Sequence, residues 1–162
     1  MTIDITSILI LVATVVTGLL AGASLDKAIV QLPARHRMGV VGFAAFSRAN
    51  DLGNGLIVYP LLGISAALLT IVAALAAFWQ SAPAVHVWPL YVSALLALLH
   101  SVTTARAAPN MLSLRQPTSD ETILTETFNR FAKWHNLRAV LQLLNFVMLL
   151  WAVIAYMVPL TQ

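Results

Sequence analysis

The chain has no cysteine and few charged residues, and both shortages exclude classes of protein. Only 9% of its 162 residues are charged, whereas an ordinary soluble domain has about 25%. Without cysteine there is no disulfide framework, no iron–sulfur cluster and no thiolate metal site. Hydrophobic residues make up 60% of the chain, and this combination predicts an integral membrane protein with one domain spanning residues 1–162.

Acidic residues are also scarce: there are six, against nine lysines and arginines. The basic residues flank apolar stretches, so membrane topology accounts for them and no nucleic-acid partner is expected. The expected partners are the lipid bilayer and a hydrophobic small molecule.

Four apolar stretches are long enough to cross a bilayer, which takes about 20 residues of helix. They predict spans at about 5–30, 52–78, 88–107 and 137–158. Pro33 is expected to end the first span and Pro109 to close the third. The fold class is therefore all-α, an integral membrane four-helix bundle.

Two further segments are expected outside the spans. Residues 34–50 are too short and too charged to span, and they predict a cytoplasmic amphipathic segment between the first two spans. A helix that starts at Asp120, capped by Thr118 or Ser119, is expected to continue into the last span and form one long fourth helix.

All nine basic residues fall in two of the connections between spans, which fixes an expected orientation. By the positive-inside bias both connections are cytoplasmic and both termini are outside, as in a bacterial inner-membrane protein. The first apolar stretch lacks a preceding basic segment and is expected to be a transmembrane helix rather than a signal peptide. The basic residues are Lys27, Arg35, Arg37 and Arg48 in one connection, and Arg106, Arg115, Arg130, Lys133 and Arg138 in the other.

A polar stripe enters the fourth span and predicts a site. At 100° per residue, Phe131, His135, Arg138, Gln142 and Asn145 share a face roughly 80° wide. Unpaired polar groups are costly in hydrocarbon, so this face must meet protein or water. We expect a polar pocket in the cytoplasmic half of the bundle.

Arginine cannot lose its proton to avoid the cost of burial, so Arg138 must have a partner. Asp51 at the start of the second span is favoured over Asp26, because Asn54 shares its face. The candidate catalytic residues are His100, Arg138 and Asp51. The candidate substrate-binding residues are Asp26, Asn54, Arg106, Asn110, Trp134, His135, Asn136, Gln142 and Asn145.

His100 lies inside the third span, where desolvation favours a neutral imidazole. Three roles stay open for it: general base, metal ligand, and hydrogen-bond partner of a threonine. His135 is expected nearer the water interface. The cofactor is unknown, and the proposed chemistry needs none.

Ligand supply limits metal chemistry. A di-iron bundle site uses Glu-x-x-His pairs, which the chain lacks. A bis-histidine haem is disfavoured, because His100 and His135 are expected to differ in depth by roughly 10 Å. A single-histidine metal site, with His100 as the best ligand, stays open.

Gly18 and Gly22 form a GxxxG pair on the first span. Such a pair lets a neighbouring helix approach closely. It predicts either a packing seam inside the bundle or a face for a homo-oligomer.

Three segments resemble the anthrone-oxygenase-like proteins, a family of small four-span membrane proteins. They are Thr17-Gly-Leu-Leu-Ala-Gly-Ala23, Arg106-Ala-Ala-Pro-Asn-Met111 and Trp134-His-Asn-Leu-Arg138. The resemblance implies oxygenation of a hydrophobic phenolic, anthrone-type ring to a quinone without a conventional cofactor. It carries over to Asn110, Trp134, Asn136 and Arg138. The alternative is a non-enzymatic membrane module that binds or transports a small molecule or lipid, or serves as an accessory subunit.

Overall fold

The computed structural model describes residues 4–157, and all regular structure in that range is helical. Four helical stretches in it are long and apolar enough to cross a membrane. The main helices are α1 (Ile5–Asp26), α4 (Gly55–Trp79), α5 (Ala84–Leu112) and α6 (Glu121–Met157). The prediction of an all-α protein with four apolar spans is confirmed.

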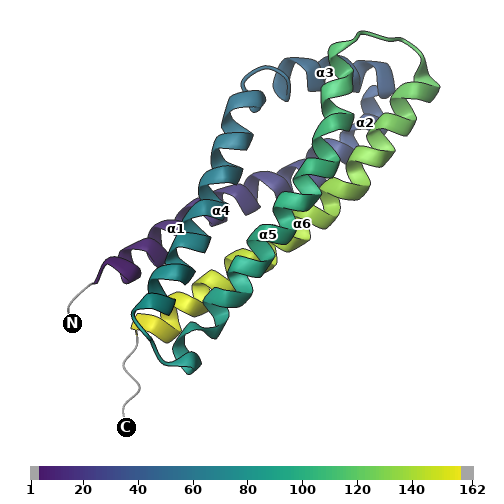
Figure 1. The fold of residues 1–162 in the computed structure, drawn as a ribbon. Coiled ribbons are helices and arrows are strands. Elements are labelled where there is room, and N and C mark those ends of the chain that lie inside the picture. Colours follow the sequence, from purple (N-terminus) through teal and green to yellow (C-terminus); the bar gives the residue numbers. More distant parts are fainter. Residues whose placement is uncertain (1–3, 158–162) are drawn as a thin grey trace.

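Short helical segments extend the bundle at one end. A π-helical turn, η1 (Lys27–Gln31), joins α1 to α2 (Leu32–Met38), and α3 (Val40–Asn50) leads on to α4. A 3₁₀ turn, η2 (Ser113–Arg115), follows α5. α2, α3 and the connection from α5 to α6 lie at the end of the molecule opposite the two termini (Figure 1).

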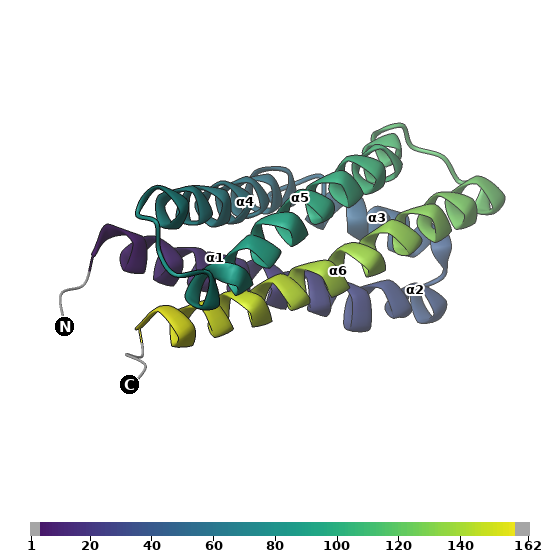
Figure 2. The ribbon, with the colours of Figure 1, turned by 60° about the horizontal axis from the view of Figure 1, so that its bottom comes forward.

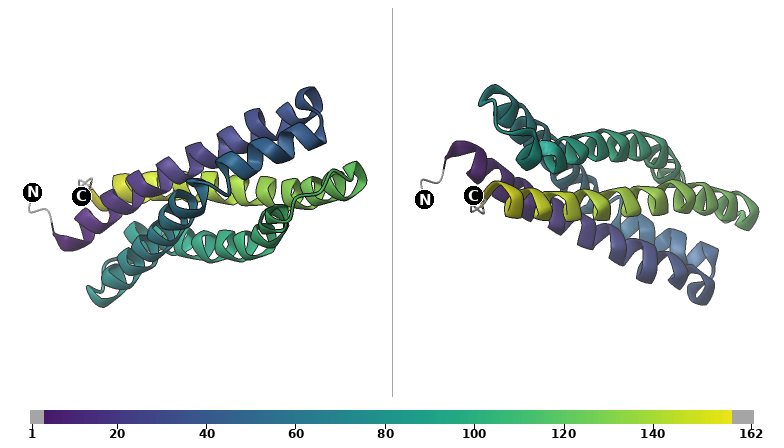
Figure 3. Two further views of the ribbon diagram at one scale, coloured as in Figure 1. Left: turned by 90° about the horizontal axis from the view of Figure 1, so that it is seen from above. Right: turned by 90° about the horizontal axis from the view of Figure 1, so that it is seen from below.

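The four long helices pack around a ring in the order α1, α4, α5, α6, so that each contacts the next and α6 contacts α1. α5 and α6 run side by side for most of their length (Figure 2). Seen from above and from below the view of Figure 1, α6 lies between the α1–α2 segment and α5 (Figure 3). The outward faces are apolar, and Leu19, Leu61 and Leu95 are each more than half exposed. Such a surface is suited to lipid rather than water.

The first helical stretch continues past Pro33, so the predicted end there is wrong. Helical structure runs from Ile5 to Met38 and ends at Gly39, whose φ of 73° is readily adopted only by glycine. Proline in a regular α-helix clashes with the carbonyl four residues earlier. The residue four positions before Pro33, Ile29, lies in the π-helical turn η1, which departs from regular α-helical geometry and can thereby make room for the ring.

The third span is also longer than predicted, because Pro109 lies inside α5 rather than at its end. The turn after the proline buries Met111, and η2 buries Leu114, in an apolar cluster with Phe128 of α6. Packing of these side chains outweighs the loss of one backbone hydrogen bond. Helical structure therefore continues to Arg115, beyond the predicted end of this span at about residue 107.

The long fourth helix is confirmed: α6 has 37 residues. At 1.5 Å per residue it is about 55 Å long, well beyond a hydrocarbon core of about 30 Å. Its N-cap is Asp120, whose Oδ1 accepts the backbone N–H groups of Thr122 and Ile123. Thr118 instead accepts the N–H of Asp120, so the cap lies two residues after Thr118 and one after Ser119, the two predicted caps. The predicted end of the last span, Val158, lies outside the described residues.

α3 packs onto the bundle through Phe43 and Ala44, which are fully buried. The ring of Phe43 meets Phe128 of α6 edge to face, with centroids 4.9 Å apart. α3 therefore covers one end of the bundle, and the position of residues 34–50 at a membrane surface stays a prediction.

The interior consists of two apolar clusters with a polar layer between them. The cluster nearer the termini joins Ile10, Ala73, Leu90 and Leu149, among others, from all four long helices. The cluster nearer α3 is built around Phe43, Phe128 and Phe131, among others. In the α1–α2 stretch, α5 and α6 the buried polar residues discussed below lie between these two clusters.

Gly18 of the GxxxG pair is used inside the chain. A Cβ atom at Gly18 would lie 2.8 Å from the ring of Phe146 in α6, whereas one at Gly22 would meet nothing within 4 Å. The first glycine therefore lets α1 approach α6, as the packing-seam interpretation expects. An oligomer through the exposed Gly22 stays a prediction.

Alanine at these two positions should have opposite effects on stability. Gly22→Ala adds helix propensity worth up to about 1 kcal/mol, whereas Gly18→Ala must displace Phe146 at a cost of about 1–3 kcal/mol. Thermal unfolding in detergent should show a higher midpoint for Gly22→Ala and a lower one for Gly18→Ala. Equal midpoints would contradict the close contact of α1 with α6.

Candidate functional site

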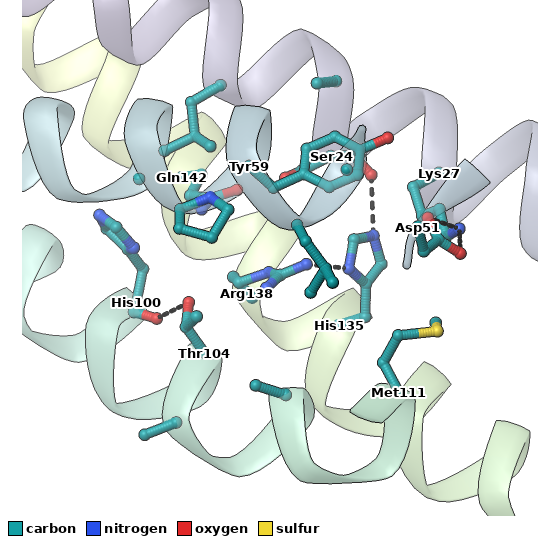
Figure 4. Close-up of a pocket in the computed structure, with 18 of the residues that line it drawn as sticks. Ser24, Lys27, Asp51, Tyr59, His100, Thr104, Met111, His135, Arg138 and Gln142 are labelled. Atoms are coloured by element: carbon teal, nitrogen blue, oxygen red, sulfur yellow. Dashed lines mark hydrogen bonds and ion pairs between the residues drawn. The ribbon is translucent and has the colours of Figure 1, made fainter. Parts of the chain in front are cut away.

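A cavity of about 470 Å³ lies between the two apolar clusters. Its volume falls within the range of small-molecule sites. All four long helices line it (Figure 4). Its polar lining residues are Ser24 and Lys27 from α1 and η1, Asp51 at the end of α3, Tyr59 from α4, His100, Ser101 and Thr104 from α5, and His135, Arg138 and Gln142 from α6.

Lys27 and Asp51 form a buried ion pair on the cavity wall. The Lys27 Nζ donates to both carboxylate oxygens of Asp51, and both side chains are about 5% exposed. Removing two charges from water is costly, and only close mutual contact with good hydrogen bonding offsets it. The pair ties α1 to the start of α4 through the turn that follows α3.

The predicted pairing of Arg138 with Asp51 is wrong, because Lys27 occupies that carboxylate. Within residues 4–157 the only other ion pair joins Arg130 to Glu126, on the exposed surface of α6. Asp26, the other predicted partner, is exposed and accepts a hydrogen bond from Gln31. Asn54 is exposed as well. Asp51 pairs with Lys27 because the helical stretch that begins with α1 places this lysine next to the start of α4.

Arg138 is held by His135 instead. Its Nη2 lies 2.5 Å from His135 Nδ1, and His135 Nε2 lies 3.1 Å from the backbone oxygen of Ser24. A guanidinium only donates and a carbonyl only accepts. His135 must therefore carry its proton on Nε2, with the Nδ1 lone pair facing Arg138. This arrangement fixes a neutral imidazole in one tautomer.

His135 is also fixed by packing. It is 1% exposed, and its ring stacks on Phe131 with centroids 5.3 Å apart. The expectation that it lies near the water interface is therefore wrong. The apolar cluster around Phe128 covers it on that side, since the bundle continues well beyond the predicted start of the last span.

His100 faces the cavity from α5 with both ring nitrogens free. The residue is 2% exposed, and neither Nδ1 nor Nε2 has a hydrogen-bond partner among the described residues. The hydroxyls of Thr103 and Thr104 donate to its backbone oxygen, not to its ring. A buried polar group without a partner is rare and calls for an explanation. Of the three roles, a ring hydrogen bond to a threonine is not seen among the described residues, and the roles of general base and metal ligand stay predictions.

Residues 4–157 contain no group of three or more histidine, aspartate or glutamate side chains placed to hold a metal ion. His100 and His135 line the same cavity, with Arg138 between them (Figure 4). The expected difference in depth rested on a third span ending at Ala107, and α5 is longer than that. Both nitrogens of His135 are engaged, so it has no lone pair for a metal.

Several predicted site residues lie away from the cavity lining. Asn145 is fully buried but does not line the cavity, and neither its amide oxygen nor its nitrogen has a partner in the described structure. The Asn110 side chain donates to the backbone oxygen of Arg106. Arg106 and Asn136 are exposed, and Trp134 is half-buried against the cluster near α3. Of the predicted set, the cavity gathers Asp51, His100, His135, Arg138 and Gln142.

The sequence interpretation missed Lys27, Ser24 and Tyr59 as site residues. Lys27 was counted only as a basic residue that sets topology. Its position gave a signal, because it follows the buried small and polar residues Thr17, Ala21 and Ser24 at helical spacing. A lysine on the packed face of a transmembrane helix requires a partner.

The structure is a helical bundle with four stretches long and apolar enough to cross a membrane, and with a polar layer and a cavity in its interior. No known protein family matches the chain, and no curated protein or solved structure is significantly similar to it. The function therefore has to be argued from the site.

The buried ion pair predicts strong coupling between its partners. Lys27→Gln or Asp51→Asn alone strands one buried charge and should cost about 3–5 kcal/mol, whereas the double variant should cost less than the sum. Chemical unfolding of the four proteins in detergent measures the coupling.

Asp26→Asn is the matched control, since that carboxylate is exposed and should matter little. Combining Asp51→Asn with Arg138→Gln should give a much smaller coupling than the ion pair, because these two side chains make no direct contact. Additivity between Lys27→Gln and Asp51→Asn instead would refute the pair.

Proposed function

We propose that this protein binds a hydrophobic phenolic molecule in the cavity and that His100 removes a proton from it. The observation that carries the proposal is the buried His100 ring on the cavity wall with no partner for either nitrogen. A neutral imidazole with a free lone pair is the usual general base of proteins.

The surroundings of His100 suit an anionic intermediate. Arg138 lines the same cavity and remains charged in any protein environment. A fixed cation in an apolar site stabilises developing negative charge more strongly than it would in water. The Gln142 side chain, 2% exposed on the same wall, has an amide oxygen with no partner in the described structure, which can accept a hydrogen bond from a ligand hydroxyl. Lys27 and Asp51 neutralise each other and leave Arg138 as the cation that faces the ligand.

The particular reaction we favour is oxygenation of an anthrone-type ring, which the resemblance of the three segments supports. Proton removal by His100 gives an electron-rich carbanion that reacts directly with dioxygen. The ring carbon loses two hydrogens; one oxygen atom becomes its carbonyl oxygen and the other leaves as water. The protein contributes orientation and charge, with Arg138 as the anion-stabilising group.

A non-enzymatic membrane module is the second candidate, and the exposed Gly22 favours it. That glycine lies on the outer face of α1 with open space before it, as an assembly face between helices requires. In that case the protein would be a binding subunit or carrier, with the polar layer serving to hold the ligand.

We further propose that the α3 end of the bundle is cytoplasmic and that both termini are outside, as in a bacterial inner-membrane protein. The arginines of α2, α3 and η2 support this orientation because they lie at the end opposite the termini. The cavity would then lie in the cytoplasmic half of the bundle.

Topology reporters should bear out this orientation. A fusion at Gln80, in the turn after α4, is expected to report an external location, and one at Arg115 a cytoplasmic location. Paired alkaline phosphatase and fluorescent-protein fusions give opposite signals on the two sides. The inverted pattern would place the cavity in the outer half.

His100→Gln should abolish turnover without unfolding the protein. Loss of a general base lowers rates by about 10²–10⁴-fold. Oxygen uptake with anthrone as substrate, in nanodiscs, measures the rate, and thermal unfolding measures the fold.

His36→Gln makes the same substitution at an exposed histidine outside the cavity and should leave the rate unchanged. Full activity of folded His100→Gln would remove His100 from the mechanism. No oxygen uptake by the unaltered protein would favour the binding module.

A further inference from the structure

The cavity is closed along the bundle axis and open at one side. The apolar cluster around Leu90 and Leu149 fills the bundle on one side of it, and the cluster around Phe43 and Phe128 fills the other. The cavity-lining residues of α6 are all buried except Arg138, which is half-buried. The packed clusters on both sides make the side of the bundle the more direct route to the cavity.

All the exposed lining residues belong to α4 and α5, and none of them is charged. They are Pro60 and Ile64 of α4, and Ser101, Ala105 and Leu112 of α5. Ile64 is 61% exposed and Leu112 is 38% exposed. These two helices are neighbours in the ring, so the gap between them opens on the apolar outer surface that would face lipid.

The cavity carries one cation that no protein carboxylate balances. Lys27 is paired with Asp51, whereas Arg138 meets the neutral His135 and has no carboxylate partner among the described residues. The other polar groups on the walls, such as Tyr59 and Gln142, are uncharged side chains. A buried cation without a counter-charge is costly, so one negative group on a bound ligand would complete the site.

We infer that the cavity is filled sideways from the hydrocarbon, through the opening between α4 and α5, by a hydrophobic molecule with one weakly acidic hydroxyl that binds Arg138 as its anion. The inference rests on the proposed function for His100. For an anthrone this hydroxyl is that of the enol tautomer, whose anion is the same as the carbanion described above. The hydroxyl proton passes to a free ring nitrogen of His100, so a neutral acid and a neutral imidazole become an anion and an imidazolium. The net charge of the cavity does not change.

The entry of the ligand from the hydrocarbon is consistent with its ionisation inside the cavity. An ionised molecule is costly to place in hydrocarbon, so a weak acid diffuses there in its neutral form. It becomes charged only where a fixed cation stabilises the anion and a base accepts the proton. An uncharged rim is enough to admit the neutral form, and the charged groups lie deeper: Lys27 and Asp51 are buried and Arg138 is half-buried.

The probe is 4-heptyl-7-hydroxycoumarin, a membrane-soluble phenol whose neutral and ionised forms have different excitation bands. In neutral phosphatidylcholine nanodiscs at pH 7 the unaltered protein should raise the anion band above that of empty nanodiscs. The 7-methoxy ether cannot ionise and should bind at least about tenfold more weakly, the loss expected for one charge-assisted contact. Equal binding of the ether would overturn the anionic state.

Variants of the cation test its role. Arg138→Gln should remove the anion band, and Arg138→Lys, which keeps the charge, should retain most of it. If Arg138→Gln does not fold, the lysine variant and the ether decide the matter. An anion band of full strength in a folded Arg138→Gln protein would overturn the assignment.

Substitutions at two glycines, each with room for a larger side chain, test the route into the cavity. Nothing lies within 4 Å of an added Cβ at Gly63, on the cavity wall in α4, or at Gly22, outside the cavity. Gly63→Leu should slow or abolish coumarin binding in stopped-flow mixing of loaded and empty nanodiscs, and Gly22→Leu should not. Unchanged binding to Gly63→Leu would overturn the sideways route.

These results separate the inference from the proposed function. A coumarin that stays neutral on the unaltered protein, together with His100-dependent oxygen uptake, would overturn the inference and leave the function standing. An anion band without any turnover of anthrone would support the inference and count against catalysis.

Discussion

The structure depends on how a membrane interior accommodates two cations with one carboxylate. Lys27 forms an ion pair with Asp51, and Arg138 donates a hydrogen bond to the neutral His135. The first contact fastens α1 to the start of α4. The second continues from Arg138 through His135 to the backbone of Ser24 and fastens α6 to α1. Because each of these groups would be costly to bury alone, the three helices are held in register at the depth of the polar layer, and the apolar clusters pack above and below it.

Much of this arrangement could be predicted from the sequence, because it depends on local pattern. The number of spans follows from apolar length, and the long α6 follows from a charged helix that continues into an apolar one. The stripe on α6 was also recovered: Phe131, His135, Gln142 and Asn145 are buried, while Leu137 and Val140 on the other face are exposed. Helical periodicity alone selects that face, and the cost of exposed polar groups in hydrocarbon says that it must be covered.

What could not be predicted depends on contacts between distant parts of the chain. Which cation receives Asp51 is decided by the path of α3, which brings residue 51 to Lys27 across 24 positions. The predicted ends of the spans at Pro33 and Pro109 were wrong. A π-helical turn precedes Pro33, and a buried cluster with aromatic side chains stabilises the helix after Pro109. The carbonyl of Ser24 gives no signal in the sequence, since any backbone oxygen becomes an acceptor only when a donor is placed against it.

The two buried histidines show how such contacts divide roles between identical side chains. At His135 the Nε2 proton is committed to a carbonyl and the Nδ1 lone pair to a guanidinium. A second proton there would set an imidazolium directly against Arg138, and repulsion between like charges in a desolvated site opposes this. His135 is therefore suited to hold Arg138 in place and unsuited to act as a base. His100 has the opposite character: its ring is equally buried, but both nitrogens are free. Under the proposed function, a ligand that ionises inside the cavity would lie between the cation that His135 positions and the proton acceptor that His100 supplies.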